Sequence, residues 1–256
     1  MGELQVWAPS PFDGDDLLPV ALGARKVDDT GRQNIEPGDL IFPTLKMLQG
    51  SSEEVKQGVD GAKAGLFWLT GVNEVFKPPI RVLACAHTKS RTLFPKPDRP
   101  EHAGLQECLS RDGRWGSSYG DCVSCSHKDW DSVNSRPPAC SESHNFTVLT
   151  PMGPAIIRFA RTSIKSARNF LTAWRMSPDT LWSHPIVITT KIRTDMVNGR
   201  PSTTHVMEMR WLMRENVPPD VQAAARTIYD QVMTANVEGR FDNQQQNGVD
   251  TDDVPY

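Results

Sequence analysis

Four of the five cysteines of this 256-residue chain lie in a segment, 101–143, that has too few apolar residues to form a core. Cys122 and Cys125 form a C-x-x-C pair, with Cys108 well before it and Cys140 well after it. The segment is otherwise rich in Gly, Ser, Asp and Pro, so it cannot order itself by burying apolar side chains. Four such thiolates can complete the tetrahedron that structural zinc prefers. The spacing therefore predicts a zinc-binding insertion held by Cys108, Cys122, Cys125 and Cys140.

Other uses of these cysteines stay open from the residues alone. Two disulfides are possible, although a cytoplasmic protein rarely keeps them. A redox-active C-x-x-C pair is possible, although no βαβ pattern surrounds it. His127 or His144 could replace one cysteine at the metal. Four protein ligands would leave no position for a catalytic water, so we expect a structural Zn²⁺. Cys85 lies in a strand-like segment and is expected to be an inert buried thiol.

Short apolar runs separated by turn residues predict mostly strands in the rest of the chain. These strands are expected at 40–49, 66–70, 72–76, 80–91, 146–149, 155–159, 186–194 and 204–214. Apolar residues at helical spacing predict a helix over 163–175 and a second one from Pro218 onward. This order favours a mainly β fold with a few helices, of the α+β class, over a parallel βαβ sheet. Within that class we expect an OB-fold-like Greek-key barrel with a zinc-binding loop insertion.

Three regions are expected along the chain. Residues 1–38, rich in Pro, Gly and Asp, should form an extended arm. Residues 39–235 should form the barrel domain with its insertion at 101–143. Residues 236–256, rich in Gln, Asn and Asp, should form a disordered acidic tail for protein interaction. The N-terminus lacks the profile of a signal peptide and no apolar run could span a membrane, so we expect a cytoplasmic protein.

The net charge of −3 hides a strongly basic segment. Between Ala155 and Arg214 there are ten basic residues and three acidic ones, while both ends of the chain are acidic. Such asymmetry is typical of nucleic-acid-binding proteins. A single-strand binder needs cations for phosphates and flat side chains for base stacking. The expected DNA-binding residues, from strand parity and from the polar loop, are Lys89, Arg91, Phe94, Trp115, Tyr119, Lys191, Arg193, Arg210 and Arg214.

The last residues form an acidic run that ends in an apolar residue, a proline and an aromatic residue. The predicted partner-binding residues are Asp250, Asp252, Asp253, Val254, Pro255 and Tyr256. This ending resembles the acidic tip of bacterial single-stranded DNA-binding proteins, which typically close Asp-Asp-Ile-Pro-Phe. In that family the tip recruits replication and repair proteins and competes with DNA for the basic groove. The resemblance implies docking of replication, recombination or repair partners at this tip.

The body resembles phage single-stranded DNA-binding proteins that combine an OB-fold, a cysteine-rich zinc insertion and an acidic C-terminus. The stretches 43–49 (Pro-Thr-Leu-Lys-Met-Leu-Gln), 120–125 and 137–140 carry this resemblance. It implies a phage protein, acting in the host cytoplasm, that binds and protects single-stranded DNA without sequence specificity. No catalytic motif is present, so catalytic residues are not expected. Two alternatives are a zinc-stapled adaptor that binds no DNA, and a nuclease with carboxylates that the sequence does not reveal.

Overall fold

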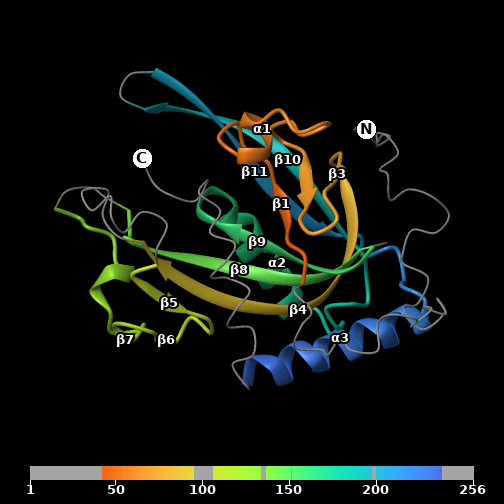
Figure 1. The fold of residues 1–256 in the computed structure, drawn as a ribbon. Helices are drawn as coiled ribbons and strands as arrows, with labels where there is room; N and C mark the ends of the chain where they lie inside the picture. The colour runs from red at the N-terminus through yellow and green to blue at the C-terminus, as the bar shows by residue number, and fades with distance from the viewer. Residues whose placement is uncertain (1–41, 95–105, 134–136, 151, 198–199, 238–256) are drawn as a thin grey trace, which may run out of the picture.

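A computed structural model describes residues 42–94, 106–133, 137–150, 152–197 and 200–237. In these ranges the protein is mainly β with three α-helices, as expected for the α+β class (Figure 1). The strands are β1 (Leu45–Met47), β2 (Phe67–Leu69), β3 (Glu74–Phe76), β4 (Ile80–Leu93), β5 (Cys108–Ser110), β6 (Trp115–Gly116), β7 (Gly120–Asp121), β8 (Cys140–Thr150), β9 (Gly153–Ala160), β10 (Ile186–Val197) and β11 (Arg200–Trp211). The helices are α1 (Glu53–Lys56), α2 (Ile164–Met176) and α3 (Pro219–Val237), with 3-10 turns η3 (Ser126–Lys128) and η4 (Arg161–Ser163).

A six-stranded antiparallel sheet forms the centre of the molecule. Its strands follow the order β11-β10-β4-β8-β9, and β5 pairs with the far end of β4. A second sheet, β1-β2-β3, is joined to the first where Thr44 bridges to Ile156 in parallel register. The described strands do not close into a barrel, so the OB-fold part of the expectation is not confirmed.

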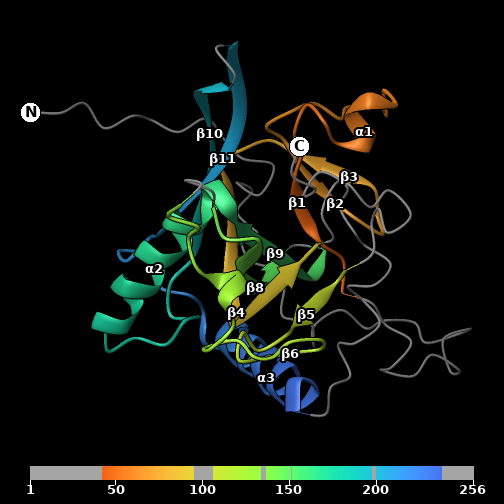
Figure 2. The same cartoon turned by 90° about the vertical axis from the view of Figure 1, so that its left-hand side faces the viewer.

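The sheet carries a separate apolar layer on each face. The main core, between the large sheet, the small sheet and α2, includes Leu45, Phe67, Ile80, Val82, Phe146, Ile157, Phe159 and Phe170. The α3 core covers the opposite face and includes Leu83, Leu149, Val221, Ala225, Ile228 and Val232. The α3 residues repeat at helical spacing and are all buried, which confirms the apolar face expected for this helix. Figure 2 shows α2 and α3 on different sides of the strands.

The alternation of side chains along β4 is interrupted in the middle of the strand. The pairing of β4 with β8 shifts between Ala84 and Ala86, so that Cys85 is an extra residue, a β-bulge. Ala84 belongs to the main core, whereas Ala86 belongs to the α3 core. His87 then contacts Phe146, a main-core residue. Uninterrupted alternation along β4 would instead put Ala86 on the face of Ala84 and His87 on the opposite face.

Two pairs of the expected strands form hairpins. Strands β2 and β3 pair across a turn in which Gly71 has a φ of +85° and Asn73 a φ of 57°. Strands β10 and β11 pair from Ile186–Trp211 to Val197–Arg200, which makes the hairpin longer than expected. Strand β1 is shorter than expected, and β8 begins at Cys140, inside the segment expected to be a loop.

None of the helices in the described ranges has the length and apolar character needed to cross a bilayer.

Candidate functional site

Two of the four clustered cysteines are placed by the central strand. Leu93 ends β4, and its ladder partners are Cys108 of β5 on one side and Cys140 of β8 on the other. Residues paired directly across a ladder project from the same face of the sheet. The two thiols therefore flank Leu93 on one face. The sequence placed both cysteines in a loop, whereas the structure places them in strands.

The other two cysteines lie in a tight turn after β7. The Asp121 carboxylate accepts hydrogen bonds from the backbone N–H groups of Val123 (2.9 Å) and Ser124 (3.2 Å). These bonds lower the pKa of the Asp121 carboxyl. An aspartate that binds the backbone two residues ahead is a common way to hold such a turn. The turn thus presents Cys122 and Cys125 together, as the C-x-x-C spacing predicts.

All four cysteines line one small cavity of about 10 Å³. A volume of this size suits a single atom or ion. Gly116 keeps the cavity open, because a Cβ atom at this position would lie 2.7 Å from Cys108 Sγ and 3.8 Å from Cys122 Sγ. The remaining side chains around the cavity are those of Arg91, Leu93, Ser110, Tyr119, His127 and Lys128.

Four thiols are a donor set that suits zinc, but in the described structure they do not lie close enough together for all four to bind one ion. No three Cys, His, Asp or Glu side chains of the described residues are close enough together to hold a metal as they stand. The strand order explains this separation. Cys108 lies on β5 and Cys140 on β8, on either side of β4, so the two residues are two strand spacings, about 10 Å, apart across the sheet. All four thiols are free rather than disulfide-bonded. Of the two alternative ligands, His127 lines the cavity and His144 does not.

Arg91 joins the cysteine cavity to a second polar centre. Its guanidinium lines the cavity and donates a hydrogen bond to Cys140. Burial raises the pKa of the Cys140 thiol, and the positive charge of Arg91 opposes that rise. The same guanidinium donates to the carboxylate of Glu142, two residues further along β8.

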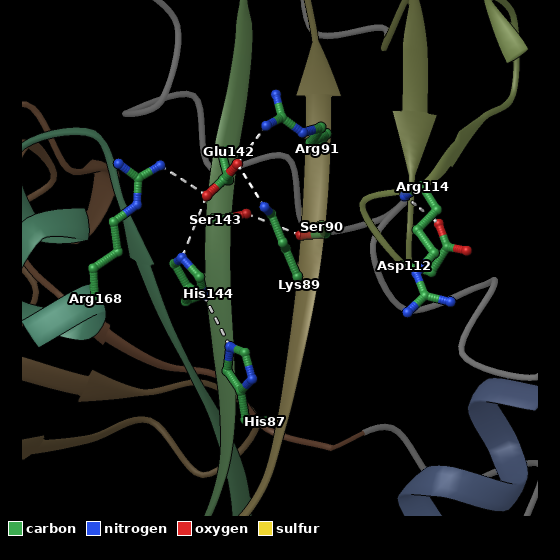
Figure 3. A network of polar contacts seen from close by, with 10 residues as sticks. All are labelled: His87, Lys89, Ser90, Arg91, Asp112, Arg114, Glu142, Ser143, His144 and Arg168. Atoms are coloured by element: carbon green, nitrogen blue, oxygen red, sulfur yellow. Dashed lines mark hydrogen bonds and ion pairs between the residues drawn. The ribbon is translucent and has the colours of Figure 1, made fainter. Parts of the chain in front are cut away.

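Glu142 gathers three cations from two other elements, β4 and α2 (Figure 3). Its buried carboxylate pairs with Lys89 Nζ at 2.9 Å and with Arg168 Nη2 of α2 at 2.8 Å, besides Arg91. His144 Nε2 lies 3.4 Å from the same carboxylate. The contact with His144, followed by the hydrogen bonds from Arg168 and Lys89, holds the pKa of Glu142 well below its usual range. Glu142 is therefore ionised and offsets one of the three positive charges around it.

His144 also contacts a second histidine. His87 Nε2 and His144 Nδ1 are 2.9 Å apart, and the rings stack with centroids 5.1 Å apart. Burial lowers the pKa of His87 to about 4, helped by His144 and Lys89. His87 is therefore neutral near pH 7. Nothing in the sequence connects Glu142, His144 and His87, although the alternation of His144, Phe146 and Val148 indicates a strand that begins before residue 146.

The expected DNA contacts on β4 are mostly engaged inside the protein. Lys89 and Arg91 share a face, as predicted, but both pair with Glu142. The aliphatic part of Lys89 also packs over Gly113. Phe94 follows β4 and is half-buried. These three residues do not form an open cationic surface in the described structure.

The cysteine loop itself exposes aromatic side chains. Trp115 is 68% exposed, Trp130 59% and Tyr119 45%. Asp112 accepts hydrogen bonds from the backbone N–H groups of Arg114 (2.7 Å) and Trp115 (3.0 Å), which fixes the turn that presents the indole. Tyr119 is more tethered, because its hydroxyl donates to Glu107 and its ring contacts His127 at 4.8 Å.

The long hairpin carries the remaining cations. Lys191 and Arg193 are exposed on one face of β10, as predicted, and Arg210 is exposed on the same face of β11. Lys191 pairs with Glu208 at 2.6 Å, and Arg193 pairs with Asp195 at 2.8 Å. Met207 and Met209 are buried on the face opposite Arg210, as expected.

Arg214 is exposed but lies beyond the end of β11, so strand parity does not place it. The predicted partner-binding residues Asp250, Asp252, Asp253, Val254, Pro255 and Tyr256 lie outside the described residues, as does the arm 1–38.

Comparisons with known proteins give one family. Neither a curated protein nor a solved structure matches the chain significantly. A family model described as Pam3 phage gp34-like protein matches residues 12–237, which is most of the chain and includes every described strand and helix. The family description agrees with the expected phage origin and says nothing about DNA or metal binding. The chain belongs to the Pam3 phage gp34-like protein family.

Proposed function

We propose that this phage protein binds single-stranded DNA, with the cysteine loop as its base-stacking platform. The observation that carries the proposal is the exposure of Trp115, Trp130 and Tyr119 on a loop whose cysteines point inward. Exposed aromatic side chains that gather on one loop are a common mark of an interaction surface. Bases of any sequence can stack on them, each for about 1–3 kcal/mol.

Cations on α2 and its preceding turn supply a path for the phosphates. Arg161, Lys165 and Arg175 are exposed along this element. Arg168 connects it to the cysteine loop, because it pairs with Glu142, two residues from Cys140. The stacking loop and the basic helix face are thus neighbours, which suits a strand that needs bases and phosphates held together.

The OB-fold remains part of the proposal. It is supported by the bridge between Thr44 and Ile156, because this contact lets β1 connect the small sheet to the last strand of the large one. Leu45, Phe67 and Ile157 then share one core. A partly open Greek-key barrel encloses its core in a similar way.

We further propose that Cys108, Cys122, Cys125 and Cys140 hold one zinc ion. Bound there, zinc would supply no reaction chemistry, since four protein ligands close its coordination shell. The residues of the chain favour such a site, because Gly116 leaves the space open and the guanidinium of Arg91 donates to Cys140. Ordering this loop would fix Trp115 and Tyr119 in position. The acidic tail would then dock replication or recombination proteins, as the resemblance implies.

A titration of labelled oligo-dT, followed by anisotropy at several salt concentrations, tests the DNA proposal. We expect binding that weakens with salt and is tighter for single strands than for duplex. Trp115→Ala should reduce affinity by roughly 5-fold to 150-fold. Val123→Ala is the matched control, because Val123 is a 71% exposed, non-aromatic residue of the same loop.

Two results would overturn the proposal in favour of the alternatives. If the protein binds neither strand form at low salt, the adaptor hypothesis gains. If a divalent cation causes cleavage of the labelled oligonucleotide, the protein is a DNA-processing enzyme.

A further inference from the structure

The β10–β11 hairpin extends far beyond the sheet that supports it. Strand β10 pairs with β4 only over Ile186–Ile188, while its pairing with β11 continues to Val197. Both views show the hairpin projecting away from the body (Figures 1 and 2). The projecting part therefore has two outer edges, one on β11 and one on β10.

The β11 edge is blocked. The Gln49 side chain accepts from the His205 N–H (3.0 Å) and donates to the His205 carbonyl (2.9 Å). The hydroxyls of Ser163 and Ser166 accept from the N–H groups of Met207 and Met209. Pro201, further out, has no N–H to offer. Such capping is how proteins prevent an edge strand from pairing with another chain.

Among the described residues, nothing protects the β10 edge in a comparable way. The N–H and the carbonyl of His205 both point outward to Gln49, so they do not bond β10. The N–H and the carbonyl of Ile192, which pairs with His205, must therefore point away from β11 as well. Thr194 and Met196, two and four residues on, share this orientation. Near the body, Thr190 contacts the Gly65 carbonyl through its hydroxyl (3.0 Å). No hydrogen bond joins the outward backbone groups of Ile192, Thr194 or Met196 to another part of the described chain.

The side chains along this edge are self-complementary. Ile192 and Met196 are both 68% exposed on one face. Arg193 and Asp195 alternate with them on the other face. Two copies of this segment, antiparallel and centred on Thr194, would place Ile192 opposite Met196 and Arg193 opposite Asp195, each pair twice. Centring the pair on Ile192 or Met196 instead would lose the match between Arg193 and Asp195.

We propose that the open edge of β10 pairs with β10 of a second copy of this chain, which forms a two-fold dimer through a continuous four-stranded sheet. The apolar pairs would cover Ile192 and Met196, and the ion pairs would fix the register. This inference does not depend on DNA binding or on zinc.

Proline substitutions on the two edges test the proposal directly. Thr194→Pro removes an outward N–H from the open edge, whereas Thr203→Pro removes one from the blocked edge at the paired position. Neither N–H is used between β10 and β11, so the hairpin should survive both changes. By sedimentation velocity of the full chain, Thr194→Pro should weaken dimerisation by at least about tenfold, and Thr203→Pro should leave it unchanged.

Charge reversal gives an independent test. Arg193→Asp and Asp195→Arg would each put like charges opposite one another and should each sediment as monomers. Mixed together, the two variants should form a heterodimer, because the acidic pair of one faces the basic pair of the other. Pairing within one chain cannot explain such a rescue. A monomeric wild-type protein, or a dimer that is indifferent to Thr194→Pro and to both charge reversals, would overturn the proposal.

Discussion

Leu93 and Cys140 face each other across the last paired position of β4 and β8. With Cys108 on the other side of Leu93, the end of the central strand sets the positions of two thiols that are far apart in sequence. The C-x-x-C turn then completes a ring around one small cavity. The strands, rather than the loop, thus provide half of the candidate metal site.

Replacing a cavity cysteine should abolish metal binding. Purified under reducing conditions, the wild-type chain should contain one zinc per protein by elemental analysis, and Cys140→Ser should contain none. Cys85→Ala is the matched control, because Cys85 is buried in β4 outside the cavity and burial raises its pKa to about 12. Equal zinc content in Cys140→Ser and Cys85→Ala would exclude this site.

A methyl group at Gly116 should damage the same site without removing a ligand. The new Cβ would lie 2.7 Å from Cys108 Sγ, closer than such atoms approach, so the thiol or the turn must move. We expect Gly116→Ala to lose most of its zinc. Gly50→Ala is the control, because nothing lies within 4 Å of a Cβ at Gly50. Full zinc occupancy in Gly116→Ala would show that the cavity opens in another direction.

Neutralising Glu142 should free a set of cations. In Glu142→Gln, Lys89, Arg91 and Arg168 lose a shared carboxylate, which should lower the free energy of unfolding by about 1–3 kcal/mol. If DNA passes this surface, its affinity should rise at low salt, and the salt slope should steepen by about 0.7 for each phosphate gained. Glu54→Gln, which changes the net charge equally near Lys46 of the small sheet, should leave the slope unchanged.

The buried His87 predicts how stability changes with pH. Its pKa is about 4 in the folded protein against 6.5 for an ordinary histidine, so the unfolded chain takes up the proton first as pH falls. The free energy of unfolding should therefore be highest above pH 6.5 and decrease between pH 6.5 and 4, by at most about 3 kcal/mol. Urea denaturation at several pH values measures this slope. His87→Gln should flatten the part between pH 6.5 and 4.5, above the range in which carboxyl groups contribute.

Removing residues 250–256 should tighten DNA binding at low salt. The segment contains three aspartates, which can compete with DNA for the same cations. Tyr256→Ala keeps those charges, so it should leave DNA affinity unchanged and abolish capture of a replication partner. The idea of competition fails if truncated and full-length chains bind oligo-dT equally at low salt.

Periodicity predicted the elements whose burial is uniform along their length. Helix α3 was predictable because Val221, Ala225, Ile228 and Val232 keep a constant spacing against one layer. The start of β8 was not, because Ser143, His144 and Asn145 are polar residues that the fold buries among other polar groups. Hydrophobic patterning has no signal for a strand of this kind.

The candidate site also has one part that the sequence predicts and one part that it does not. The cysteine set was predictable because the chemistry of thiols and metals restricts the spacing. Glu142 was not, because its partners Lys89 and Arg168 come from distant segments. Only the pairing of β4 with β8, and the packing of α2 beside them, reveals that these charges meet.

The bulge at Cys85 has a consequence for how this protein can change over evolutionary time. Deleting one residue there would restore plain alternation and leave every later side chain of β4 in its present layer, because the bulge supplies one residue more than β8 pairs with. Lys89, Arg91 and Leu93 would still share the side of Glu142 and the cysteines. Relatives can therefore keep the site with one residue fewer between Ile80 and Leu93, whereas a one-residue deletion that spared the bulge would turn the side chains beyond it toward the α3 layer.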